Sequence, residues 1–370
     1  MATGSAGAVG LDGVVAAETR LSHVDGDAGR LVLAGHDVEQ LAGQTTFEDA
    51  CGLLWDGQLP NEARRAQIAE ALGAARLRAH AGLPQLARAL ELSSAADALR
   101  AALAQLERAG GGEPHPADIT GAVAVYSAAW HRKRTGQPPL APDATRSHAA
   151  DYLYLLRGQP SGGAAERALD TYLVTVSDHG MNASTFAARV VASTASDLVS
   201  AIVAAVGALK GPLHGGAPGP VLDMLDAIGE PDRAVAWLEA ELAAGRRIMG
   251  MGHRIYRVRD PRAAVLEVAV DRLEKSAVAE DRTRKRLELA RAVERAATAL
   301  LRERYPERAL CANVEFYTAV LLDALGIDRA LFTSTFAVGR VAGWIAHVAE
   351  QRAGGRLMRP ASRYVGPMPT

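Results

Sequence analysis

The 370-residue chain has few cysteines, few lysines and few aromatic residues. Its two cysteines, Cys51 and Cys311, lie far apart and form no CxxC pair, which argues against a zinc ribbon, a thioredoxin-type site and a disulfide scaffold. Residues 1–10 lack a basic region followed by an apolar run, so we expect a cytoplasmic protein without a signal peptide. The net charge of −1 gives no overall field that would attract nucleic acid or a membrane surface.

Several common catalytic motifs are also absent. The chain has no GxxxxGK(S/T), no GxSxG, no HExxH and no GxGxxG after a strand. These absences weigh against P-loop nucleotide hydrolysis, serine hydrolase chemistry and a Rossmann-type cofactor site. The apolar stretch 199–209 is too short to cross a bilayer.

What is present favours a helical globular protein. The chain is 49% hydrophobic and 22% charged, and its length suggests one large or two packed domains. A strand signal occurs only at residues 19–33, where Asp25 and Gly26 form a hairpin turn. We therefore predict an all-α chain with a short N-terminal β-hairpin. The expected helices are 46–55, 61–80, 86–109, 117–130, 147–156, 196–209, 218–228, 262–276, 281–303 and 331–351.

The helix at 196–209 has the clearest pattern. Its large apolar residues recur at helical spacing, and its other side is also small and apolar. A helix that is apolar nearly all round is buried in a core or in a subunit interface. The residues on the main stripe are Leu198, Ala201, Ile202, Ala205, Val206 and Leu209.

Three of the ten histidines, His179, His214 and His253, lie beside glycines, which allow a ligand to approach the ring closely. A single such histidine is more often structural, but three in one stretch favour a shared site. A helix beginning at Pro218 would place its positive end near His214 and keep the imidazole neutral. A neutral imidazole can donate a hydrogen bond to a carbonyl oxygen that becomes an enolate, which favours proton abstraction rather than metal binding.

Charged residues suggest an anion site nearby. The basic cluster after His253 is either a solvated loop or a pocket for carboxylates or phosphates. Arg340 lies in an apolar helix, where burial is costly without an anionic partner. Glu315 is flanked by apolar and aromatic residues, so it is either a helix-cap glutamate or a base with a raised pKa. The basic cluster consists of Arg254, Arg257, Arg259 and Arg262.

These segments, in this order, resemble the citrate synthase family over nearly the whole chain. The matching segments are GLDGVVAAET from Gly10, GHDVEQL from Gly35, HGMNASTFAARV from His179, LKGPLHGGA from Leu209, GMGHRIYRVRDPR from Gly250 and RPASRYVGP from Arg359. The resemblance implies a homodimer with a two-domain helical fold. A large domain, 1–215 and 328–370, would form the dimer interface, and a small mobile domain, 216–327, would bind coenzyme A.

The resemblance also implies an acyltransferase that condenses acetyl-CoA with oxaloacetate and water, with the thioester as substrate and no cofactor or metal. His214 would polarise the thioester carbonyl, Glu315 would remove the methyl proton, and His253 would polarise the ketone. Asn182 and Ser184 would orient His214. Oxaloacetate would be bound by His179, His253, Arg262, Arg340 and, from the partner subunit, Arg359. Coenzyme A would lie along Met249, Gly250, Met251, Gly252 and Arg257.

The chain departs from the family pattern at three places. Glu315 stands where most members have aspartate, and a displacement of roughly 1 Å can cost about a hundredfold in rate unless the backbone compensates. Ala34-Gly35-His36 replaces Arg-Gly-Tyr, and Ala361 replaces an arginine.

Two alternatives stay open. A 2-methylcitrate synthase would use propionyl-CoA, which one methylene barely separates from acetyl-CoA. A non-catalytic homologue has only the Glu315 substitution in its support.

Overall fold

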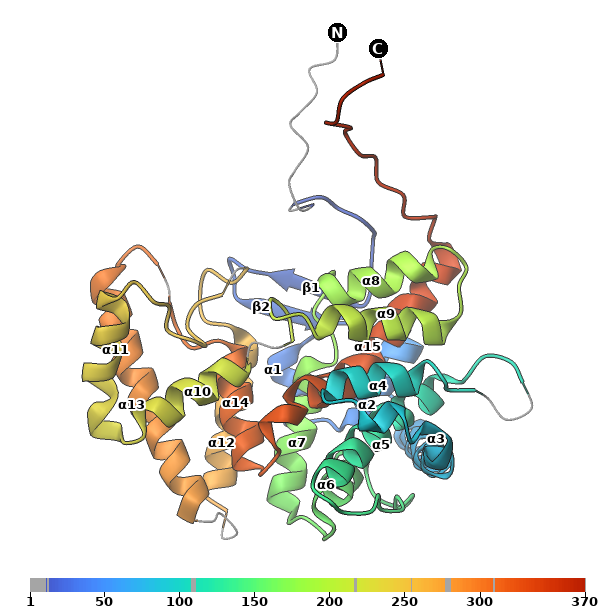
Figure 1. The fold of residues 1–370 in the computed structure, drawn as a ribbon, viewed down its shortest axis with the longest axis horizontal. Coiled ribbons are helices and arrows are strands. Elements are labelled where there is room, and N and C mark those ends of the chain that lie inside the picture. The colour runs from blue at the N-terminus through green and yellow to red at the C-terminus, as the bar shows by residue number, and fades with distance from the viewer. Residues whose placement is uncertain are drawn as a thin grey trace.

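The computed structural model describes residues 11, 13–107, 111–215, 218–253, 255–276, 281–308 and 310–369. Arg254, segment 1–10 and the expected start of the small domain at Gly216 lie outside this range. Within it the chain is mostly helical with one small antiparallel sheet, which confirms the predicted fold class (Figure 1).

The sheet consists of β1 (Ser22–Asp25), β2 (Arg30–Leu33) and β3 (His36–Asp37) in that order. The first two strands form the predicted hairpin, with Val24 paired to Leu31. The third strand was not predicted. It forms because Ala34 and Gly35 both adopt positive φ and make a tight turn, which pairs Leu33 with His36.

Most helices begin at a residue whose side chain accepts a backbone N–H of the first turn. Thr46, for example, forms a capping box with Asp49. The helices are α1 (Val38–Leu41), α2 (Phe47–Asp56), α3 (Glu62–Ala81), α4 (Ala95–Leu103), α5 (Pro116–Arg134), α6 (His148–Arg157), α7 (Gly163–Val176), α8 (Ala183–Ala192), α9 (Leu198–Leu209), α10 (Pro218–Ile228), α11 (Ala234–Ala243), α12 (Pro261–Glu274), α13 (Asp281–Arg304), α14 (Val314–Ala324) and α15 (Phe332–Gly354).

The predicted helix 86–109 is wrong. Two short 3₁₀ turns, Leu83–Leu86 and Ala89–Glu91, precede α4, which begins where the Ser94 hydroxyl accepts the N–H of Asp97. This serine is a start signal inside a segment whose apolar residues suggested one continuous helix. Helices α1, α7, α8, α11 and α14 were not predicted.

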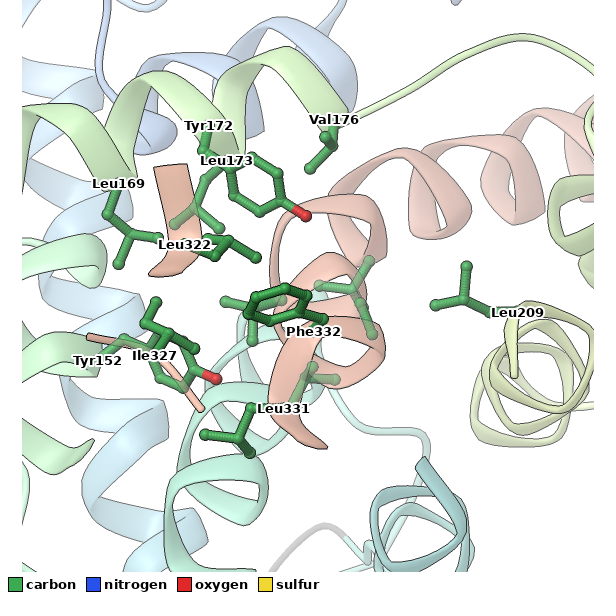
Figure 2. Close-up of a cluster of buried hydrophobic side chains, with 14 of the residues drawn as sticks. Tyr152, Leu169, Tyr172, Leu173, Val176, Leu209, Leu322, Ile327, Leu331 and Phe332 are labelled. Atoms are coloured by element: carbon green, nitrogen blue, oxygen red, sulfur yellow. The ribbon is translucent and has the colours of Figure 1, made fainter. Parts of the chain in front are cut away.

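The core connects two groups of helices. In Figure 1, α10 to α14 lie on the left and most of the remaining helices on the right, where α15 packs on α5 and α8. Figure 2 shows Tyr172 and Leu173 of α7 beside Leu322 of α14, with Phe332 of α15 close by. Helix α12 also packs on α7. These contacts join the two groups, and the predicted division into domains stays a prediction.

Helix α9 buries the apolar stripe that the sequence predicted, while Val199, Val203, Ala204, Gly207 and Ala208 on its other side are only half-buried. In the described part of the chain, no helix is both long enough and apolar enough to cross a membrane.

Helix α15 makes its closest approach to the loop after α7 at Gly343. A Cβ atom added there would overlap the carbonyl oxygen of Ser177 and lie 2.9 Å from Asp178 Oδ1. We expect Gly343→Ala to lower the free energy of unfolding by about 1–3 kcal/mol, because the packed backbone must move. Gly354→Ala, at an open position at the end of the same helix, is the control. Urea unfolding that gives the same midpoint for both variants would contradict this close packing.

Candidate active site

The first part of the site is the loop between α7 and α8. The ring of His179 is buried, and its Nε2 lies 3.1 Å from the Tyr256 hydroxyl. The preceding residue, Asp178, is fully buried and contacts His347 Nε2 at 3.2 Å and the hydroxyl of Ser22 in β1. This network fixes the loop from behind, so His179 has a defined position.

His214 lies in the turn after α9, and α10 begins at Pro218 as predicted. Its Nε2 lies 2.8 Å from the Ser184 hydroxyl, which in turn lies 2.8 Å from Asn182 Oδ1. Burial, together with the positive charge of Arg340, lowers the pKa of His214 to about 4. The ring is therefore neutral at pH 7, although burial is the main cause rather than the helix dipole that the sequence suggested.

Two glycines tie the His253 segment to the start of α14. Gly250 and Gly252 have φ of 74° and 78°, a conformation that suits glycine. The backbone N–H of Asn313 donates to the Gly250 carbonyl at 2.9 Å, and the Asn313 amide donates to the Gly252 carbonyl at 2.7 Å. A Cβ atom on Gly250 would lie 2.8 Å from that of Phe316. The segment that carries His253 and the helix that carries Glu315 are thus held in fixed register.

The backbone fixes the orientation of His253. Its Nδ1 accepts the N–H groups of Ile255 at 3.0 Å and Tyr256 at 3.1 Å, so the proton of the neutral ring lies on Nε2. Burial, followed by the charge of Arg262, lowers the pKa of His253 to about 4. The Nη2 of Arg262 lies 3.2 Å from the same Nε2. Two donors therefore meet at one point, where a single carbonyl oxygen could accept from both.

Two arginines supply buried positive charge. Arg262 forms two bonds to the carboxylate of Asp260, at 3.1 and 2.9 Å. Arg340 is 1% exposed, donates from Nε to the Val176 carbonyl at 2.5 Å and stacks on Phe336 at 4.7 Å. Over the described residues no carboxylate forms an ion pair with Arg340, and burial lowers its pKa to about 10. This cation would be stabilised by an anionic ligand.

Glu315 is the second residue of α14, and the cap is Asn313, which accepts the N–H groups of Glu315 and Phe316. The Oε2 of Glu315 is buried and has no hydrogen-bond partner within the described structure. Burial raises the pKa of Glu315, and the positive charge of Arg262 partly opposes this rise. Glu315 is therefore a buried carboxylate of raised pKa in the first turn of α14, and its role as a base stays a prediction.

The structure does not bring every predicted residue to this place. Arg359 is exposed on the segment after α15, and Arg257 is exposed beside Asp27, 3.6 Å from its carboxylate. Met249 also lies at the surface. The predicted roles of these residues, and of Gly250, Met251 and Gly252 towards coenzyme A, stay predictions.

Sequence reasoning missed three residues, Tyr256, Asp260 and Trp344. Tyr256 and Asp260 lie inside the segment that had been singled out, and Asp260 has a cap signal because Pro261 follows it. Trp344 resembles an ordinary core residue. No group of three or more histidine, cysteine or acidic side chains suited to a metal occurs among the described residues.

Neutral histidines, a buried carboxylate and two buried arginines define an acid–base enzyme site for an anionic carbonyl compound. Comparison with known proteins identifies the family. Residues 10–361 match the citrate synthase C-terminal domain, and the chain belongs to the citrate synthase family.

The relatives match over nearly the full length. A citrate synthase of Haloferax volcanii is 38% identical, covering 96% of this chain and 95% of its own. The putative citrate synthase 2 of Mycobacterium tuberculosis strain H37Rv is 40% identical, covering 97% and 93%.

Solved structures agree with this assignment. The citrate synthase of Thermotoga maritima has a TM-score of 0.82 at 34% identity, covering 98% of this chain and 96% of its own. A Thermoplasma acidophilum citrate synthase in a ternary complex with carboxymethyl coenzyme A and oxaloacetate has a TM-score of 0.85 at 27% identity, covering 98% and 97%.

Two of the histidines with depressed pKa values, His214 and His253, make stability depend on pH. In the unfolded chain these histidines take up a proton below about pH 6.5, whereas in the folded protein His214 and His253 do so only near pH 4. Each should therefore reduce stability by up to about 1.4 kcal/mol per pH unit as the pH falls through this range. Urea unfolding at pH 7.5, 6 and 5 should show a shallower loss in the His214→Gln/His253→Gln double variant. An equal loss in both proteins would contradict the assignment.

Proposed function

We propose that the protein is a citrate synthase that converts acetyl-CoA, oxaloacetate and water into citrate and coenzyme A. The observation that carries the proposal is Glu315, whose buried Oε2 has no hydrogen-bond partner among the described residues and whose pKa responds to the charge of Arg262. The Nη2 of Arg262 lies 3.2 Å from His253 Nε2. A base of raised pKa in a site that also contains neutral imidazoles and buried cations suits proton removal next to a carbonyl group. Family membership supports the same reaction.

Enolisation is the first step. Glu315 removes a proton from the acetyl methyl group, and His214 donates a hydrogen bond to the thioester oxygen as negative charge develops there. A neutral imidazole suits this role because it can donate its N–H to the carbonyl oxygen as that oxygen becomes the oxygen of an enol. Asn182 and Ser184 hold the ring in place.

Condensation follows. The enol carbon attacks the ketone carbon of oxaloacetate, and His253 Nε2 and Arg262 stabilise the developing alkoxide, which His253 protonates. Arg340, Arg262 and His179 hold the two carboxylates. Water then hydrolyses the citryl thioester and releases coenzyme A. The ternary complex of the Thermoplasma acidophilum relative contains oxaloacetate and a coenzyme A analogue, which supports these substrates.

We further infer a cytoplasmic homodimer. The half-buried apolar side of α9 suits a matching surface on a second copy. Arg359 lies on a segment that extends away from its own site, so it would complete the site of the partner subunit (Figure 1). Coenzyme A would lie along residues 249–252 and Arg257.

Two alternatives are outcomes of the test. Propionyl-CoA as the substrate would make the protein a 2-methylcitrate synthase, and no observation favours it over acetyl-CoA. A non-catalytic homologue rested on Glu315 alone, and the burial of that carboxylate beside an intact set of histidines and arginines argues against it.

Release of free thiol measures the reaction directly. We expect acetyl-CoA with oxaloacetate to release coenzyme A, with little release when oxaloacetate is omitted. Glu315→Gln should lower kcat by about a hundredfold or more, because the base is lost while the shape is kept. Glu303→Gln, at an exposed position on α13, is the control.

Propionyl-CoA is assayed in parallel, and a higher kcat/KM for it than for acetyl-CoA would establish the 2-methylcitrate reaction. A folded protein that binds oxaloacetate but releases no thiol from either thioester would refute the enzymatic proposal.

The role of Arg359 across the dimer can be tested with mixed subunits. Arg359→Ala and Glu315→Gln homodimers should each be weakly active. A purified heterodimer of the two contains one site with both residues intact, so it should regain about half of the wild-type activity. No recovery in a heterodimer that still binds oxaloacetate would show that Arg359 does not act on the partner subunit's site.

A further inference from the structure

His347 of α15 belongs to a buried row of polar side chains that reaches the loop carrying His179. Its Nδ1 lies 2.9 Å from Nη1 of Arg189 in α8, and its Nε2 lies 3.2 Å from Asp178 Oδ2. All three side chains of this row are almost completely buried. Because Asp178 directly precedes His179, the row connects α8 and α15 to a residue that is predicted to bind oxaloacetate.

The contact with Arg189 decides the tautomer of His347. A guanidinium N–H can only donate, so His347 Nδ1 accepts and carries no proton. The one N–H of the ring therefore lies on Nε2 and donates to Asp178 Oδ2. Arg189 is itself fixed, because Nε donates to Gln351 Oε1 at 2.9 Å and Nη1 donates to Glu350 Oε2 at 2.6 Å. The contacts of the ring thus allow a single tautomer.

Asp178 depends on this donor because its carboxylate is fully buried and has few other contacts. Its Oδ1 has no hydrogen-bond partner within the described residues, so Oδ2 accepts both bonds, from His347 and from the hydroxyl of Ser22. The Ser22 oxygen in turn accepts the backbone N–H of Gly180 at 2.8 Å. One connected set of bonds therefore holds the residues before and after His179. Loss of the His347 donor would leave the buried carboxylate with one bond.

We propose that His347 is a positioning residue for the oxaloacetate site, fixed by Arg189 as the donor to Asp178 and acting through the loop that carries His179. Without this donor, the buried carboxylate must move to reach water or another donor, and the adjoining His179 moves with it. The effect on oxaloacetate rests on the proposed function, whereas the tautomer of His347 is a property of the protein without substrate.

The tautomer can be measured by ¹⁵N NMR of histidine-labelled, ligand-free protein at pH 8, with the His347 signals assigned from a His347→Gln spectrum. Wild-type protein should show a protonated Nε2 and an unprotonated Nδ1 on His347. A protonated Nδ1 would overturn the proposal. This outcome needs only the wild-type signals, so it does not depend on the activity of any variant.

A matched pair of variants tests the effect on oxaloacetate. His347→Gln keeps an amide donor near the position of Nε2, whereas His347→Met has a similar length and no donor. Calorimetric titration should show oxaloacetate binding weakened about tenfold in His347→Met, the effect of one lost hydrogen bond, and less than about threefold in His347→Gln. In the thiol-release assay of His347→Met, KM for oxaloacetate should rise similarly, while KM for acetyl-CoA changes by less than about twofold.

His148→Met is the control. His148 of α6 is fully buried, and its Nδ1 lies 3.3 Å from Arg76 Nη1, so it repeats the arginine contact of His347. Its Nε2 has no hydrogen-bond partner in the described part of the chain, so this ring supplies no donor to a carboxylate there. His148→Met should therefore lower the midpoint of urea unfolding without weakening oxaloacetate binding.

Two binding results would also overturn the proposal. One is unchanged oxaloacetate affinity in His347→Met. The other is equal weakening in His347→Gln or in His148→Met, which would show that the effect does not come from the lost donor. If oxaloacetate binds but no thioester is turned over, the proposed function fails, whereas NMR and titration still decide the role of His347. A wild-type protein that binds no oxaloacetate would refute both.

Discussion

The burial of two positive charges in one place is the constraint on which the site depends. Arg262 is paired with Asp260, whereas Arg340 contacts the Val176 carbonyl and the Phe336 ring and is influenced by the more distant charge of Asp178. Both cations disfavour protonation of the nearby imidazoles, and Arg262 attracts the carboxylate of Glu315. The charges suited to a dicarboxylate thus also set the protonation states of the acid–base groups. Anion binding and catalysis are therefore coupled through the same two side chains.

The first turns of three helices position polar side chains of the site. Three site residues each occupy the second position of a helix, and in each case the side chain of the cap accepts the backbone N–H of the site residue itself. The capping bond fixes the Cα atom, so only the side-chain rotamer remains free. Placement on rigid helix ends provides the precision that proton transfer needs. The three pairs of cap and site residue are Asn182 and Ser184, Asp260 and Arg262, and Asn313 and Glu315.

Local patterns predicted part of this architecture. The capped, periodic helices and the hairpin could be read from the sequence, and glycine context singled out the three histidines. The helices that flank the site, α7, α8 and α14, were missed, and an internal serine cap broke the expected helix 86–109. The contact of Arg340 with the last residue of α7, Val176, joins residues 164 positions apart, and no local pattern encodes such a contact. Trp344 was missed because a tryptophan in an apolar helix reads as core, and only its bond to Ser184 distinguishes it.

Different kinds of contact surround the ring nitrogens of His253 and His214. His253 has Nδ1 against two backbone N–H groups, and a backbone donor has one orientation and cannot become an acceptor. Its proton is therefore confined to Nε2 by the chain itself. His214 faces a hydroxyl, which can donate or accept by rotating about one bond. A rotatable partner fixes a tautomer only if its other contacts remove the choice. The other contacts of the Ser184 hydroxyl are Trp344 Nε1, which donates to it at 3.1 Å, and Asn182 Oδ1, which lies at 2.8 Å.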